Sequence, residues 1–391
     1  MEGRTFTEDL AGGAASLPRS HHAGGAAPEA LQPAQSSREA VAAAAPRLRI
    51  LAFPRSGYPY TERFYAAVEA LGGEVIEGEW SGHWLAERVR PGDVVHMHWP
   101  SFYYDRGPGA LGRTTAMLKF WLFLRVIRSR GGRLVWTAHN LYPHDGGRRG
   151  RAHRMARRLV AARASRVLVH SEYALARVGA EFGIPKQKML VVPHGHLIDY
   201  FPRALTPADA RARLGIGAAE YVYGFVGTCM PYKRVEEVID AYGAMHGDGV
   251  LLIAGGFRSS DYLALNREKL ARLHGRRIIF EPRDLGDDEM QIYMQASDIL
   301  VCPYRDILTS GTALTAFSFG TPVIVPDNGA MRESVPADCG IVYDASRSDG
   351  LYQAMVAARS RRFDRAAIES YAETQRWSDA AARFVAALRA E

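Results

Sequence analysis

Short apolar runs alternate with helical patterns from Arg47 to the end of the chain. The runs in the first half are rich in Val, Leu and Ile and are bounded by Gly, Pro, Asn and Asp, which is typical of buried strands. Between them, apolar residues recur at helical spacing. The strands predicted in this half are 47–54, 74–80, 93–100, 133–140, 166–172 and 188–195, and the predicted helices are 60–72, 116–132 and 151–164.

The same pattern starts again after a break near 197–220, where LTPADARARLG predicts a short capped helix. A helix is predicted at 234–245 and a final helical segment at 363–390. The strands predicted in this second half are 221–228, 250–256, 277–283, 298–304, 321–327 and 340–344.

Alternating strands and helices favour right-handed crossovers and a parallel sheet, so we expect an α/β protein. The two series predict two Rossmann-like, doubly wound domains whose strand carboxyl ends face a shared cleft. Residues 1–46 are rich in Ala, Gly, Ser and Pro, and this composition predicts a disordered tail. The acidic residues near its start do not fit a secretory signal. The expected domains are 47–200 and 201–362, with 363–391 crossing back to the first.

Composition narrows the class of protein. Of the 391 residues, 47% are hydrophobic and 23% are charged, which is ordinary for a globular protein. No apolar run approaches the ~18–20 residues of a membrane-spanning helix. The 3 cysteines form no CxxC pair, which argues against a disulfide scaffold or a structural zinc site and fits a reducing compartment.

Positive charge is concentrated in one segment. The formal net charge is +7, yet residues 106–171 hold 15 arginines and lysines against one acid, Asp145. A cationic surface of this kind favours a polyanionic partner: an anionic membrane, a nucleic acid or a phosphorylated substrate.

The stretch from Asp298 to Asn328 carries the most chemistry. It reads as strand, loop, helix, glycine and strand, with small hydroxyl residues and glycine where the loop becomes a helix. Exposed backbone N–H groups at a helix start form a ready anion site, although the same residues also suit a plain N-cap. The candidate residues are Thr309, Ser310, Gly311 and Thr312.

Several motifs in order resemble the GT-B glycosyltransferases, and family 4 in particular. They are FVGT…K (225–233), IAGG (253–256), YMQASDILVCPY (293–304) and GTPVI (320–324). The resemblance covers most of 47–390. It implies the GT-B fold, a nucleotide-sugar donor held mainly by the second domain, an acceptor held mainly by the first, and no bound metal or other cofactor.

The family commonly places an Arg after FVG and a Lys five residues later, both on the donor diphosphate. Lys233 matches that Lys, whereas Thr228 stands at the Arg position and the neighbouring Arg234 is a candidate substitute. Retaining members carry two glutamates where this chain has Ile307 and Thr315. In this respect the chain looks more like the inverting β-mannosyl- and related transferases of bacterial exopolysaccharide assembly.

Inversion needs a base that takes the proton of the acceptor hydroxyl. Three residues at strand ends of the first domain are candidates, and each has an alternative as a structural polar residue. They are Asp145, His139 and His98.

Other residues are weaker candidates. His194 and His196 stand where family 4 usually has Asn-Gly, and we expect them to shape the cleft or touch donor phosphate; without a nearby ligand cluster, HxH does not predict a metal site. Arg55 and Gly57 match the loop that approaches both substrates. Two further candidates for phosphate or the nucleobase are Arg258 and Arg283.

The sequence therefore predicts a hexosyltransferase, with mannose from GDP-mannose as the expected donor sugar. A lipid-linked oligosaccharide is the expected acceptor, in exopolysaccharide or cell-surface glycan synthesis. The basic 116–166 segment predicts peripheral binding to the inner face of the plasma membrane from the cytoplasm. The alternatives are a retaining family 4 enzyme that uses a UDP-sugar, a nucleic-acid-binding protein that uses 106–171, and a nucleotide-sugar epimerase; the leading interpretation excludes nucleic acid as a partner.

Overall fold

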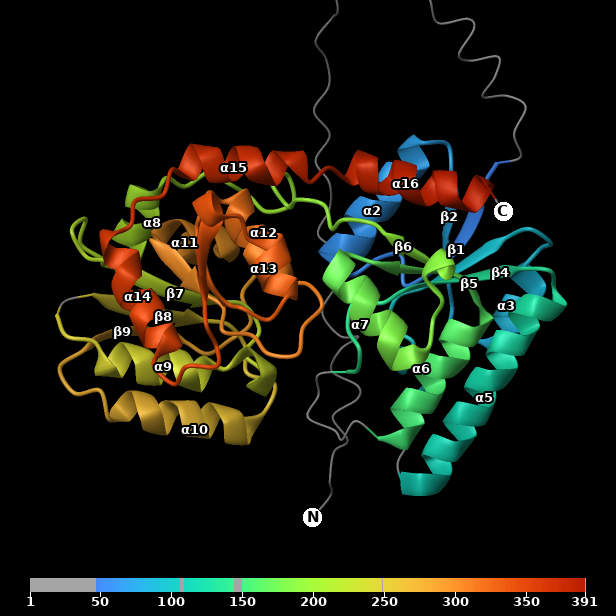
Figure 1. The fold of residues 1–391 in the computed structure, drawn as a ribbon, viewed down its shortest axis with the longest axis horizontal. Helices are drawn as coiled ribbons and strands as arrows, with labels where there is room; N and C mark the ends of the chain where they lie inside the picture. Colours follow the sequence, from blue (N-terminus) through green and yellow to red (C-terminus); the bar gives the residue numbers. More distant parts are fainter. Residues whose placement is uncertain (1–46, 106–108, 144–149, 248, 391) are drawn as a thin grey trace, which may run out of the picture.

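Two α/β lobes stand side by side in the computed structural model, which describes residues 47–105, 109–143, 150–247 and 249–390 (Figure 1). Each lobe contains one 6-stranded parallel sheet, in the order β2-β1-β3-β4-β5-β6 in the first and β12-β11-β10-β7-β8-β9 in the second. The expected pair of doubly wound parallel sheets is therefore confirmed.

The first lobe alternates strands and helices along most of its length. Its strands are β1 (Arg49–Phe53), β2 (Glu74–Glu77), β3 (Val94–Met97), β4 (Arg133–Thr137), β5 (Ala164–Val169) and β6 (Met189–Val191). Its helices are α2 (Pro59–Ala70), α3 (Gly82–Arg88), α4 (Ser101–Tyr104), α5 (Gly109–Ser129), α6 (Arg151–Arg163), α7 (Glu172–Phe182) and the 3-10 turn η1 (Lys186–Lys188).

The second lobe repeats this organisation. Its strands are β7 (Val222–Val226), β8 (Val250–Ala254), β9 (Arg277–Glu281), β10 (Ile299–Val301), β11 (Val323–Pro326) and β12 (Gly340–Tyr343). Its helices are α8 (Pro207–Arg213), α9 (Val235–Ala244), α10 (Ser260–Ala271), α11 (Asp287–Ala296), α12 (Gly311–Ser318), α13 (Ala330–Ser334), α14 (Gly350–Ser360) and α15 (Arg365–Thr374), with the 3-10 turns η2 (Pro231–Lys233) and η3 (Ala337–Cys339).

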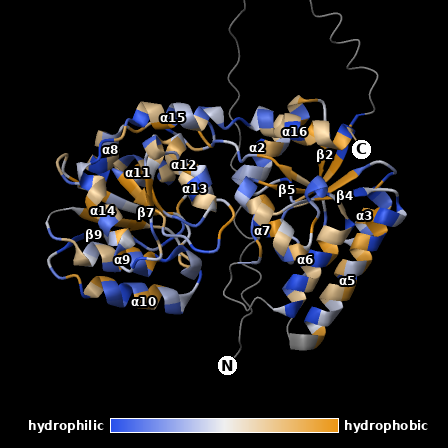
Figure 2. Ribbon diagram, viewed as in Figure 1, coloured by the Kyte–Doolittle hydropathy of each residue, from blue (hydrophilic) through white to orange (hydrophobic). Residues whose placement is uncertain are grey.

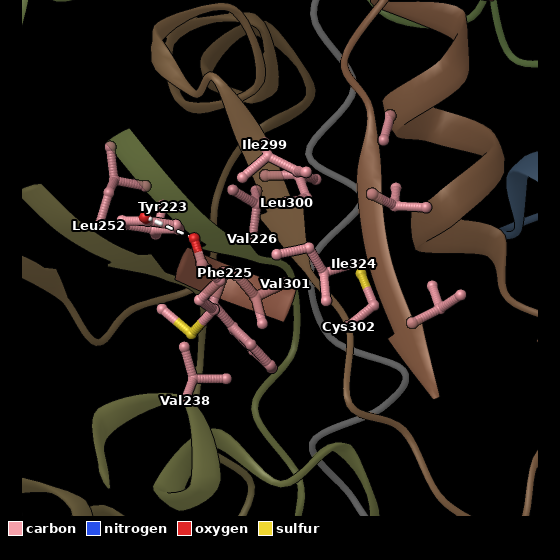
Figure 3. Packing of buried hydrophobic residues seen from close by; sticks show 14 of the residues in the cluster. Tyr223, Phe225, Val226, Val238, Leu252, Ile299, Leu300, Val301, Cys302 and Ile324 are labelled. Carbon is pink, nitrogen blue, oxygen red and sulfur yellow. Dashed lines mark hydrogen bonds between the residues drawn. The ribbon is translucent and has the colours of Figure 1, made fainter. Parts of the chain in front are cut away.

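The apolar runs of the sequence become the buried strands. Every residue of β7 and β8 is buried, and Figure 3 shows how Phe225, Leu252 and Val301 pack with their neighbours in the core of the second lobe. In Figure 2 the strands are mostly orange, whereas the helices carry blue residues on their outer faces. Burial on both faces explains why these strands lack the alternation of half-exposed strands.

The last helix returns to the first lobe. Helix α16 (Trp377–Arg389) lies against α2, and its Phe384 packs in the first lobe's core with Phe64 (Figure 1). The expected single helical segment at 363–390 is in fact two helices, because the chain is extended at Arg376 between α15 and α16. This break lets the chain pass from one lobe to the other.

Helix ends follow the local signals. Helix α8 has a full capping box, in which Thr206 Oγ accepts from the Asp209 N–H at 3.2 Å and the Asp209 carboxylate accepts from the Thr206 N–H at 3.1 Å. Helix α5 starts at Gly109, earlier than the predicted 116. Within the described ranges, no helix combines the length and apolarity needed to cross a membrane.

Candidate functional site

The second sheet changes its direction of growth between β7 and β10, and Lys233 lies at that point. Doubly wound sheets bind ligands at such a switch point, beyond the carboxyl ends of the strands. The Lys233 side chain is buried against Tyr304, with Nζ 5.2 Å from the ring centre. A β-carbon on Gly227 would lie 3.9 Å from Nζ and 3.8 Å from Thr312 Oγ1, so glycine leaves space between these two groups.

Lys233 is a buried cation without an anionic partner in the described part of the chain. Cys229 and Cys302 affect its pKa, but burial raises the pKa of each thiol to about 12, so both are neutral at pH 7. Burial also lowers the pKa of Lys233 itself. A bound anion would satisfy this ammonium and restore its preference for the charged form.

Helix α12 begins at the same place. Ser310 is its N-cap, with Oγ accepting from the Ala313 N–H at 3.2 Å, so the plain capping role is present. A β-carbon on Gly311 would meet nothing within 4 Å, which leaves the first turn open. Thr309 precedes the cap and is partly exposed. Thr312 and the first turn of α12 therefore lie next to Lys233, and together they offer an anion a cation and helix N–H groups.

Arg234, the candidate substitute for the family's diphosphate arginine, is already paired with acidic residues. Its guanidinium is held by two carboxylates of α9, with Nη2 2.7 Å from Glu237 Oε1 and Nη1 3.2 Å from Glu236 Oε1. Glu237 also pairs with Arg305 at 2.7 Å. Arg234 therefore stays a predicted donor contact whose charge is already paired in this structure. Thr228, at the family's Arg position, is partly exposed beyond β7.

The other two candidate arginines of this lobe are also paired. Arg258 follows β8 and contacts Asp284 at 2.8 Å. Arg283 follows β9, the edge strand, and binds Glu289 at 2.5 Å and Glu281 at 3.0 Å. Arg258 is close enough to Lys233 to lower the pKa of that lysine. Arg283 instead stabilises the loop between β9 and α11 through its two ion pairs.

Four histidines follow four adjacent strands at the carboxyl edge of the first sheet. They are His98 after β3, His139 after β4, His170 after β5 and His194 after β6. All four rings surround Tyr60 of α2, with ring centres 4.7–5.7 Å from its own. The strand-end prediction for His98 and His139 therefore brings them together.

Three of these histidines are joined in a hydrogen-bonded chain. His170 Nδ1 is 2.9 Å from the Val192 carbonyl oxygen, and His170 Nε2 is 3.2 Å from His139 Nδ1. His139 Nε2 is 2.9 Å from His98 Nδ1, and His98 Nε2 is 2.7 Å from the Tyr65 hydroxyl. From the Tyr65 hydroxyl the chain continues to the buried ring of His96, whose Nδ1 lies 2.8 Å from that hydroxyl and whose Nε2 lies 2.8 Å from Thr137 Oγ1.

The Val192 carbonyl determines the direction of this chain. A carbonyl only accepts, so His170 must donate to it from Nδ1, and His139 must then donate to His170 Nε2. By the same logic His98 donates to His139, and Tyr65 donates to His98. Every imidazole is neutral with an assigned tautomer. Burial supports this state: it lowers the pKa of His98 and His139 well below the usual value and that of His170 to about 4.

His194 and His196 lie on the chain that links the lobes. His194 Nδ1 is 2.7 Å from the carbonyl oxygen of Gly195. The His196 backbone binds the last helices: its N–H donates to the Gln375 carbonyl at 2.8 Å, and its carbonyl accepts from Trp377 Nε1 at 2.7 Å. His196 thus shapes the link between the lobes.

The loop after β1 is held by carboxylates. Arg55 Nη2 donates to both carboxylate oxygens of Glu69, at 2.9 and 3.0 Å, which fixes the position of its guanidinium. Gly57 has φ 82°, a conformation that favours glycine, and its N–H donates to Glu62. Asp145, the remaining candidate base, lies outside the described residues.

Two of the contacts between the lobes come from α13 and from the loop before α12. The Glu333 carboxylate of α13 accepts from the Glu172 and Tyr173 N–H groups, both at 2.8 Å, and so caps α7 of the other lobe. Leu308, from the loop before α12, is buried in the core cluster of the first lobe. The adjacent Ile307 lines a small cavity of about 90 Å³ between the lobes.

The two positions where retaining relatives carry glutamates are apolar or internally bonded. Ile307 is 6% exposed, and the Thr315 hydroxyl donates to the Gly311 carbonyl at 2.8 Å. In the residues that the structure describes, no group of three or more His, Cys, Asp or Glu side chains is arranged to hold a metal ion.

Sequence reasoning missed His170, Tyr60 and Glu333. A signal for His170 was present, since a histidine follows each of four strands in turn. Glu333 gave no such signal, because its role depends on how the lobes meet.

Two family models match the chain. Residues 83–197 match Glycosyltransferase Family 4, and residues 220–360 match Glycosyl transferases group 1. A GDP-mannose:glycolipid 4-beta-D-mannosyltransferase of Xanthomonas campestris is 25% identical over 268 residues, which cover 68% of this chain and 70% of the relative. A D-inositol 3-phosphate glycosyltransferase of Mycolicibacterium vanbaalenii is 28% identical over 234 residues, covering 55% of this chain and 50% of the relative.

Solved structures share the fold. Anabaena HepE, in complex with UDP and glucose, aligns with a TM-score of 0.64 and 16% identity over 88% of this chain and 100% of its own. A glycosyltransferase of Rickettsia africae aligns with a TM-score of 0.66 and 15% identity over 88% and 98% of the two chains. The protein is therefore a GT-B glycosyltransferase, with a family 4 region in its first lobe and a group 1 region in its second.

Proposed function

We propose that the enzyme transfers mannose from GDP-mannose to a lipid-linked oligosaccharide with inversion of the anomeric centre, in exopolysaccharide or cell-surface glycan synthesis. The donor site is supported by the buried ammonium of Lys233, which has no anionic partner among the described residues and lies beside the first turn of α12. A departing diphosphate would find there a cation and helix N–H groups already in position.

The choice of mannose and of a glycolipid acceptor rests on the Xanthomonas relative, whose name states both. Inversion is favoured because Ile307 and Thr315 stand where retaining relatives carry glutamates. No metal or other cofactor is part of the proposal, since Lys233 and α12 offer the diphosphate its positive charge.

Membrane binding is proposed for the outer face of α5 and α6, which lie side by side in Figure 1. Leu111, Leu118 and Leu122 of α5 are 82%, 56% and 47% exposed. Their spacing of seven and four residues places them on one face of the helix. Exposed basic residues lie on the same two helices: Arg113, Lys119, Arg125, Arg128, Arg151 and Arg158. Figure 2 shows blue and orange residues side by side on these helices.

Such a face suits an anionic bilayer better than a nucleic acid, because each exposed leucine gains from the apolar phase and each basic side chain contributes about 1 kcal/mol near an anionic surface. We therefore propose that the enzyme works from the cytoplasm at the inner face of the plasma membrane. Co-sedimentation with phosphatidylglycerol vesicles tests this, with duplex DNA of equal charge as competitor. Replacement of the three leucines by serine should abolish vesicle binding; retained binding, or displacement by DNA, would contradict the proposal.

The donor is tested by calorimetry with GDP-mannose, GDP-glucose, UDP-glucose and UDP-galactose. GDP-mannose should bind most tightly, and NMR of the product should show an inverted anomeric configuration. Preferred binding of a UDP-sugar together with a retained configuration would instead identify a retaining enzyme.

A further inference from the structure

His194 differs from the other three histidines around Tyr60 in its free ring nitrogen. It follows β6, its ring lies 4.9 Å from Tyr60 and 5.3 Å from Trp377 of α16, and it is partly exposed. His194 Nδ1 faces the Gly195 carbonyl oxygen at 2.7 Å. Because a carbonyl only accepts, Nδ1 carries the proton and Nε2 carries the lone pair. Within the described residues, Nε2 has no hydrogen-bond partner.

The ring nitrogens of His98, His139 and His170 are all occupied. Each lone pair in that chain already accepts a hydrogen bond from the next member, and the Val192 carbonyl prevents the chain from reversing. A base needs a lone pair that can reach the substrate. The expected bases His139 and His98 lack one in this arrangement, whereas His194 has one.

His194 also has the right place in the fold. It lies at the carboxyl edge of the first sheet, where the acceptor is expected, and at the start of the link to the second lobe. Three residues later, the Leu197 N–H donates to Ser318 Oγ of α12 at 2.9 Å. Helix α12 is the element whose first turn stands beside Lys233. Ser318 is the last residue of α12, so this bond joins the link after His194 to the second lobe at the end of α12 opposite its first turn.

We propose that His194 Nε2 is the general base that takes the proton of the acceptor hydroxyl, an inference that rests on the proposed function. The acceptor O–H bond breaks and its proton moves to Nε2. The oxygen forms a bond to the anomeric carbon, and the bond from that carbon to the phosphate oxygen breaks. The electron pair leaves on the nucleoside diphosphate, whose charge Lys233 stabilises. His98, His139 and His170 act as positioning residues that hold the rings around Tyr60.

The surroundings keep His194 neutral and ready to accept. The titratable groups around it are Tyr60 from α2, His170 after β5 and His139 after β4, while α16 contributes the uncharged Trp377. Burial lowers the pKa of His194 to about 3. That is sufficient for this step, because an alcohol oxygen that is bonding to the anomeric carbon becomes far more acidic than a free hydroxyl. A pH profile above pH 5 would therefore not report this base.

The test uses the full-length enzyme and radiolabelled GDP-mannose, with water or a membrane lipid extract as acceptor. His194→Asn keeps a donor for the Gly195 carbonyl but places no lone pair at the position of Nε2. His194→Ala opens a cavity that free imidazole can enter. His83→Asn is the matched control, since His83 of α3 has an 85% exposed side chain. Donor affinity by calorimetry and thermal unfolding are measured for each variant.

We expect His194→Asn to bind GDP-mannose as the wild type does and to lose transfer by about 10²–10⁴-fold, the usual contribution of a general base. Imidazole should restore transfer in His194→Ala and have no effect on the wild type or on His83→Asn. Wild-type transfer by His194→Asn, or imidazole rescue of His139→Ala but not of His194→Ala, would overturn the assignment. A wild type that binds no nucleotide sugar would overturn the proposed function instead.

Discussion

Replacement of Lys233 by methionine should separate donor binding from stability. Methionine keeps the length and the apolar stem of the lysine but removes the charge. Lys233 is 9% exposed, and no carboxylate pairs with it in the described part of the chain. In the unliganded enzyme its ammonium therefore carries an uncompensated desolvation cost. In the complex, the proposed diphosphate would be its only anionic partner.

The expected loss of donor affinity follows from that geometry. A hydrogen bond to a charged group contributes about 1.5–3 kcal/mol, and two unit charges 4 Å apart near a protein surface interact by about 4 kcal/mol. A loss of about 2–4 kcal/mol corresponds to about 30-fold to 1000-fold weaker binding. Stability should not fall, because the substitution removes a buried charge.

Calorimetric titration with GDP-mannose and thermal unfolding of the unliganded protein measure the two effects. Lys186→Met is the matched control, since Lys186 is exposed on η1 in the first lobe. Donor affinity within threefold of the wild type for Lys233→Met would refute the donor site. A marked drop in its unfolding temperature would show that Lys233 is a structural residue.

Three further predictions concern pH, the lobe contact and the second cation. Burial lowers the pKa of His170 to about 4, so below pH 6.5 the unfolded state binds more protons than the folded state. The free energy of unfolding should therefore fall by about 2 kcal/mol for this residue alone as the pH drops from 7 to 5. Urea unfolding at several pH values measures this change, and a free energy of unfolding that does not depend on pH would contradict the neutral histidine chain. Glu333→Gln replaces one of the two acceptor oxygens that cap α7 with a donor and should lower the free energy of unfolding by about 1 kcal/mol. The contact between the lobes should weaken, which X-ray scattering would detect as a larger radius of gyration. Unchanged scattering and stability would show that this contact does not hold the lobes together. Arg234→Gln should change donor affinity less than threefold, because Glu236 and Glu237 already hold this guanidinium; a loss as large as that of Lys233→Met would show that the pair opens for the donor.

The fold was predictable because buried parallel strands leave an unmistakable signal. Strands β7 and β8 are buried along their whole length, so each appears in the sequence as a continuous apolar run without polar residues. Helix α10 was not predicted. It buries only Tyr262 and Asn266, so its apolar face is too narrow to stand out from a loop.

The site was predictable only as far as strand ends determine it. That rule placed His98 and His139 at one edge of the first sheet. Lys233, in contrast, was predicted from the family's pattern of an Arg after FVG and a Lys five residues later. It does not show which nitrogen of a ring is occupied, since that depends on a carbonyl from a different strand, Val192. For Arg234 a warning was present in the sequence, because two glutamates follow it within the next turn.

The seat of Leu308 has a consequence for enzyme engineering. This side chain belongs by sequence to the half that carries the group 1 region, yet it completes the apolar interior of the other half. A chimaera that joins this first lobe to the second lobe of another enzyme would leave a void in the core of the first lobe, unless the segment around Leu308 is kept. When lobes are exchanged to change the sugar specificity, the loop around Leu308 should therefore stay with the first lobe, whose core it fills.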